Sequence, residues 1–78
     1  MKIYILDSKN ERKPIEVLES AFVSDVKKQM KEKYKMNEEV ELLFNGIILN
    51  DNDNLFDLEI KPGSTINYLG QFKAGLNN

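Results

Sequence analysis

The stretch LLFNGIILND, Leu42–Asp51, places Asn45-Gly46 between two apolar runs. Asn-Gly is the strongest short signal for a two-residue β-hairpin, because both central residues of a type I′ turn need a positive φ. We therefore predict a hairpin here, with a strand over Val40–Phe44 (VELLF) leading into the turn. Successive side chains of a strand point to opposite faces, so the apolar run before the turn cannot face one side only.

The segments around the hairpin have patterns of two kinds. Residues 1–6 (MKIYIL) and 12–18 (RKPIEVL) alternate in the manner of half-buried strands. Pro14 has no N–H to donate, so the second of these strands should lie at the edge of a sheet. Residues 23–34 carry apolar side chains at spacings of three and four, which predicts an amphipathic helix. The remaining elements are a short, partly helical segment over 55–60 and a last strand over 65–69.

The order of these elements is strand, strand, helix, strand, short strand, strand. A sheet and a helix each need an apolar partner, so the simplest arrangement packs one helix across one face of a mixed sheet. A chain of 78 residues is long enough for one small core, and it contains no internal repeat or linker before its tail. The pattern thus predicts a single α+β domain.

The composition excludes several classes of function. Hydrophobic residues make up 41% and charged residues 31% of the chain, and the net charge of −2 does not suit a dedicated nucleic-acid binder. The absence of cysteine and histidine removes the thiol nucleophile, the thiolate zinc site and the usual catalytic base. No run approaches 18 apolar residues. We expect no enzyme, cofactor, metal, nucleic acid or membrane, and a cytoplasmic or nuclear monomer.

The alternation of side chains along each strand predicts which leucines face water. Glu41 and Leu43 share one face of their strand, and a glutamate is rarely buried unpaired, so we expect Leu43 to face water. In the last strand Leu69 lies on the same face as Asn67 and should also be exposed. If the strands are neighbours, the two leucines form an apolar island, which suits a protein-docking site as well as it suits an unremarkable surface.

Four stretches, in this order and spacing, resemble the ubiquitin family: MKIYI, SDVKKQM, LLFNGIILND and DLEIKPGSTINYL. The resemblance covers residues 1–73 nearly without gaps and leaves 74–78 as a flexible tail. It implies a β-grasp fold, with a five-stranded mixed sheet of order 2-1-5-3-4 and one helix across it. The implied role is that of the protein-binding ubiquitin-like domains of proteasome shuttle proteins. Proteasomal ubiquitin receptors and ubiquitin-associated or ubiquitin-interacting domains are then the implied partners.

The resemblance also assigns the site. Leu43 and Leu69 match two members of the family's hydrophobic recognition patch, and the third falls on Ser8, which should weaken or narrow binding. Residues around the patch fall on Gly46, Ile47 and Asn67, with Ile47 making the rim more apolar. Of the pair Ile47 and Ile48, we expect one to pack inward and the other to extend the patch.

Two further expectations follow from the resemblance. Lys27 matches a buried lysine whose acidic partner falls here on Asp51, so we predict an ion pair between them. The terminal Gly-Gly of the family aligns with Ala74-Gly75, which is less suited to an activating enzyme. An alternative function is therefore a modifier that is processed after Gly75 and conjugated through the tail Lys73-Ala74-Gly75.

Overall fold

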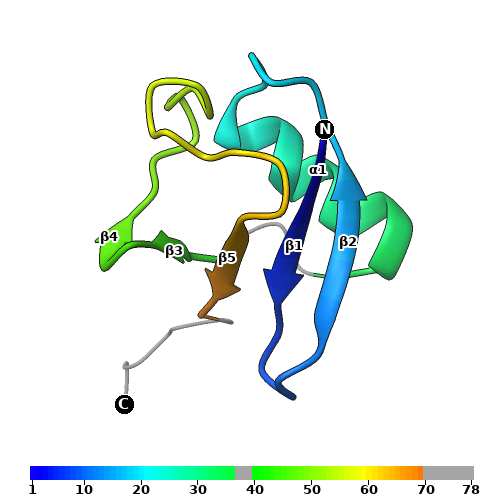
Figure 1. The fold of residues 1–78 in the computed structure, drawn as a ribbon. Helices are drawn as coiled ribbons and strands as arrows, with labels where there is room; N and C mark the ends of the chain where they lie inside the picture. Colours follow the sequence, from blue (N-terminus) through cyan, green and yellow to red (C-terminus); the bar gives the residue numbers. More distant parts are fainter. Residues whose placement is uncertain (37–39, 70–78) are drawn as a thin grey trace.

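The computed structural model describes residues 1–36 and 40–69, and in these ranges it contains five strands and one helix (Figure 1). The strands form one sheet of order β2-β1-β5-β3-β4. Strands β1 and β5 are parallel and the other neighbours are antiparallel, so the predicted mixed sheet and its strand order are confirmed. The elements are β1 (Lys2–Leu6), β2 (Arg12–Glu16), α1 (Val23–Tyr34), β3 (Leu42–Phe44), β4 (Ile47–Ile48) and β5 (Thr65–Tyr68).

The core lies between the sheet and α1, which crosses behind β1 and β2 in Figure 1. Alternate strand residues supply one side of it, as the pattern predicted, and the spacing of apolar residues along α1 supplies the other. Pro14 lies on β2 at the edge of the sheet, where no further strand needs its missing N–H. The side chains that are fully enclosed are Ile3, Ile5, Ile15, Leu42 and Ile66 from the sheet, Val23, Val26 and Met30 from α1, and Leu55.

Both ends of α1 are fixed by local contacts. The N-cap residue is Phe22, whose N–H donates to Oδ2 of Asp25 over 2.9 Å. Lys35 ends the helix in the left-handed conformation, with φ of 60°. The hydroxyl of Tyr34 donates to the carbonyl oxygen of Pro14 over 2.7 Å and thereby ties the last turn to the edge strand β2.

The predicted hairpin turn is confirmed, because Asn45 and Gly46 have φ of 54° and 77°. The strand that enters it is shorter than predicted and covers only Leu42–Phe44. The segment 55–60 is not helical: it forms a series of turns, with Glu59 at φ of 62° and the N–H of Ile60 bonded to the oxygen of Leu55 over 3.0 Å. Leu55 and Ile60 are both buried, and a looped backbone allows both to reach the core.

Candidate functional site

A row of side chains crosses four strands on the sheet face that points away from α1. Leu43 pairs with Ile48 of β4 on one side and with Asn67 of β5 on the other. Asn67 in turn pairs with Leu6 of β1. Residues paired across a sheet share a face, so Ile48, Leu43, Asn67 and Leu6 lie side by side.

Leu69 extends this row along β5. Its N–H donates to the carbonyl oxygen of Glu41 over 3.0 Å, which continues the β3–β5 pairing. Leu69 therefore lies diagonally across from Leu43, two residues beyond Asn67, and the two leucines share a face as predicted. Leu43 is half-buried rather than exposed, because Ile48 and Asn67 flank it on both sides. We call Leu6, Leu43, Ile48 and Leu69 the sheet-face patch.

The expectation that Ile47 or Ile48 packs inward is wrong, since both side chains are exposed. Strand β4 is two residues long and lies at the edge of the sheet, beyond the reach of the core. The two-residue turn pairs Ile48 with Leu43 and Ile47 with Phe44. Ile48 therefore joins the row of Leu43, and Ile47 belongs to the opposite face of the hairpin.

The remaining predicted site residues lie at the borders of the patch. Gly46 is exposed in the hairpin turn, and Ser8 is exposed in the turn that joins β1 to β2. Sequence reasoning missed Leu6, although the alternation of β1 already placed it opposite the buried Ile5. Beyond Leu6, the guanidinium carbon of Arg12 lies 4.2 Å from the ring centroid of Tyr4, so an aromatic and a cation border the patch.

The model of the Ubiquitin family matches residues 3–73, a range that contains the helix and all but the first residue of the sheet. The chain belongs to the ubiquitin family. Among curated proteins, no sequence matches it significantly. The ubiquitin-like domain thus combines the β-grasp fold of the family with an apolar sheet face.

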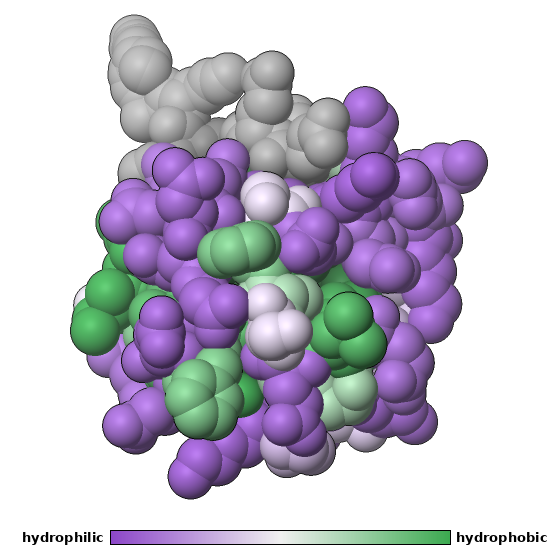
Figure 2. Space-filling view, turned by 90° about the horizontal axis from the view of Figure 1, so that it is seen from above, coloured by the Kyte–Doolittle hydropathy of each residue, from purple (hydrophilic) through white to green (hydrophobic). Residues whose placement is uncertain are grey.

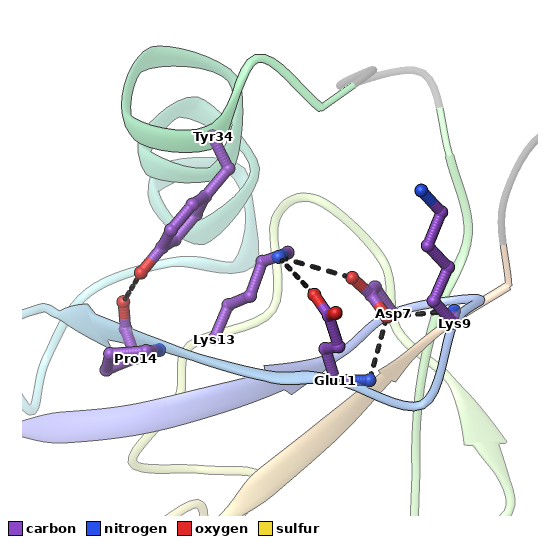
Figure 3. A network of polar contacts seen from close by, with 6 residues as sticks. All are labelled: Asp7, Lys9, Glu11, Lys13, Pro14 and Tyr34. Carbon is purple, nitrogen blue, oxygen red and sulfur yellow. Dashed lines mark hydrogen bonds and ion pairs between the residues drawn. The ribbon is translucent and has the colours of Figure 1, made fainter.

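The turn that carries Ser8 in this ubiquitin-like domain is held by a polar network (Figure 3). Oδ1 of Asp7 accepts the N–H groups of Lys9 and Glu11, each over 2.9 Å. Nζ of Lys13 lies 3.4 Å from Asp7 and 3.1 Å from Glu11. The hydrogen bond from the N–H of Glu11 is the main cause that lowers the pKa of Asp7, and the bond to the Glu11 carboxylate is the main cause that raises the pKa of Lys13.

The predicted ion pair is present: Nζ of Lys27 lies 2.6 Å from Oδ1 of Asp51. The N–H of Ser24 also donates to the carbonyl oxygen of Asp51, over 3.1 Å. Both contacts join the loop after β4 to the first turns of α1. The pair therefore lies apart from the sheet-face patch and acts on the scaffold that supports it.

Ubiquitin-like domains are generally not enzymes. Residues 1–36 and 40–69 contain no group of three acidic, histidine or cysteine side chains placed to hold a metal ion. No helix in these ranges has the length and apolar character needed to cross a membrane. The predicted conjugation tail, Lys73, Ala74 and Gly75, lies outside the described residues.

Proposed function

We propose that this ubiquitin-like domain is a protein-interaction module that docks other proteins through the sheet-face patch. The observation that carries the proposal is the register of three strands, which gathers Ile48, Leu43 and Leu69 on the face away from the core. A small domain needs its apolar side chains inside. A cluster of them left outside, beside the polar Asn67, has the composition of a docking surface.

The size of the patch sets the expected strength of binding. Burial of apolar surface contributes about 25 cal/mol per Å². A patch of a few hundred Å² gives several kcal/mol, from which the loss of translational and rotational freedom is subtracted. We therefore expect binding with a Kd in the micromolar range, which suits a contact that forms and dissolves repeatedly.

We expect the partners to come from the ubiquitin–proteasome system, because the chain belongs to the ubiquitin family. Proteasomal ubiquitin receptors and ubiquitin-associated or ubiquitin-interacting domains are the expected partners, with Leu43 and Leu69 as the anchors on this chain. Ser8 supplies no apolar contact, whereas Ile48 and Leu6 add two to the same face. The range of partners should therefore overlap with that of the family without being identical. In this role the domain acts as a monomer in the cytoplasm or nucleus.

The test is a titration of the ¹⁵N-labelled chain with an isolated ubiquitin-associated domain, followed by NMR. We expect shift changes along the row of Leu43 and a several-fold weaker affinity for both Leu43→Ala and Leu69→Ala. Leu18→Ala is the matched control, because Leu18 is an exposed leucine outside the patch. Unchanged affinities in the two patch variants, or shift changes confined to other faces, would refute the proposal.

The alternative function, a modifier processed after Gly75, rests on the register of the sequence QFKAG at that position. A chain ending at Gly75 would be incubated with an activating enzyme and ATP, and the products analysed by mass spectrometry under non-reducing conditions. A thioester-linked adduct would support the modifier. Failure to form any adduct, with the Gly75 carboxylate free, would exclude it.

A further inference from the structure

The large hydrophobic side chains that are exposed in the described ranges fall into two groups on different parts of the molecule. Ile47, Ile48 and Leu69 belong to the sheet strands and their continuation, as described above. The second group lies in the loops at the opposite end and consists of Leu18, Phe22 and Phe56, which are 74%, 47% and 70% exposed. Figure 2 looks down on this end and shows apolar side chains separated by polar ones.

The two loops that carry the second group are joined to each other. The N–H of Leu55 donates to the carbonyl oxygen of Ala21 over 2.9 Å, and the side-chain amide of Asn54 donates to that of Ser20 over 2.8 Å. Phe22 and Asn54 also form an antiparallel bridge. The two loops that carry the exposed side chains are therefore held together by hydrogen bonds. Binding of a partner would cost little entropy for ordering these loops.

The surface between these side chains is hollowed and acidic. One hollow is lined by Leu18 and Phe22, a second by Phe56, and Met1 lines both. Six carboxylates and two lysines line the two hollows, and the N-terminal ammonium group of Met1 lies 3.7 Å from Oε1 of Glu16, so the local balance is −3. The carboxylates are those of Glu16, Asp25 and Glu32 in the first hollow and Glu19, Asp57 and Glu59 in the second.

Phe22 is also an unfavourable residue for the position it occupies. It is the N-cap of α1, a position at which serine, threonine, aspartate and asparagine are preferred. The first N–H groups of this helix, those of Val23, Ser24 and Asp25, donate to backbone oxygens instead of to a capping side chain. The phenyl ring takes no part in capping, and it stays about half exposed instead of joining the enclosed core. Neither helix capping nor core packing explains a phenylalanine at this point.

We propose that Leu18, Phe22 and Phe56 form a second docking surface, the loop-end surface, which binds a basic amphipathic segment of another protein. Apolar side chains of that segment would pack on the exposed leucine and phenylalanines. Its lysines and arginines would face the surrounding carboxylates, which raise the rate of encounter and disfavour acidic segments. None of the residues that line the two hollows belongs to the sheet-face patch, so both surfaces can be occupied at once.

The experiment is an NMR titration of the full ¹⁵N-labelled chain with a synthetic helical peptide of leucine and lysine. Two matched peptides replace every lysine by glutamate or every leucine by serine. We expect shift changes in residues 16–22 and 53–61 with the leucine–lysine peptide only, weakened by added salt. Phe22→Ser should reduce its affinity several-fold while the chain stays folded in a urea titration, because Phe22 is half exposed and lies outside the enclosed core. Leu43→Ala should leave the shift changes of residues 16–22 and 53–61 unchanged.

This design separates lost binding from lost folding, since the urea midpoint of Phe22→Ser is measured beside its affinity. The proposal is overturned if the glutamate peptide binds equally well or if residues 16–22 and 53–61 do not shift with the leucine–lysine peptide. It is also overturned if Phe22→Ser binds like the original chain. Shift changes that depend on the concentration of the chain alone would assign the surface to a second copy and refute a basic partner.

Discussion

Replacing Asp51 with asparagine removes the carboxylate that faces the ammonium group of Lys27 at 2.6 Å. The two side chains differ in their access to water, since 12% of the Lys27 side chain and 58% of the Asp51 side chain are exposed. Without Asp51, the charge of Lys27 stays enclosed and loses its partner, while the loop loses a link to α1. The domain should therefore become less stable without changing its fold.

The magnitude lies between two limits. Exposed ion pairs contribute about 0.2–1 kcal/mol, because water screens both charges. Breaking a fully buried pair costs about 3–5 kcal/mol, because it leaves an uncompensated buried charge. Here the lysine is largely enclosed and the aspartate is mostly in water, so we expect Asp51→Asn to lower the free energy of unfolding by about 1–2 kcal/mol.

Urea denaturation measures this change, and a slope of about 1 kcal/mol per M converts it to a midpoint shift of about 1–2 M. In a double-mutant cycle, Lys27→Met keeps most of the aliphatic stem, and Asp51→Asn should cost little when added to it. Asp57→Asn is the matched control, since Asp57 is exposed and has no ion pair within the described ranges; it should change stability by less than about 0.5 kcal/mol. Equal effects of the two aspartate changes, or an additive cycle, would refute the reasoning.

Three other changes test the fold that supports the patch. Gly46→Ala should lower the free energy of unfolding by about 1–2 kcal/mol, because Gly46 has φ of 77°. An added Cβ would meet no atom within 4 Å, so backbone strain is the only expected cause. An unchanged melting temperature would contradict this. Leu42→Ala should cost about 2–5 kcal/mol in urea denaturation, and Leu43→Ala clearly less, because Leu42 is fully buried and its neighbour is not; equal losses would show that the faces are misassigned. Asp7→Asn should make the domain less stable above about pH 4, the usual pKa of an aspartate. This difference in stability should disappear as the pH falls through the lowered pKa of Asp7. A stability difference between the Asn variant and the original chain that persists at pH 2 would contradict the assignment.

Local features of the sequence determined much of the fold. The spacing of apolar residues defined α1 over Val23–Tyr34, since a helical period requires no information from elsewhere in the chain. Asn45-Gly46 determined the hairpin, because few residues accept two successive positive φ angles. Pro14 indicated an edge strand through its missing N–H. Each of these rests on backbone geometry within a few residues.

Tertiary structure alone decided which side chains gather on the surface. Alternation assigns a residue to a face of its own strand, but its exposure depends on the strands that flank it. Leu43 is therefore half-buried between neighbours, and the pairing of β4 brings Ile48 to the patch in place of Ile47. Burial of both Leu55 and Ile60 likewise overrode the expected helical turn between them. Burial and cross-strand contacts depend on residues far apart in the chain, whereas capping, turns and periodicity do not.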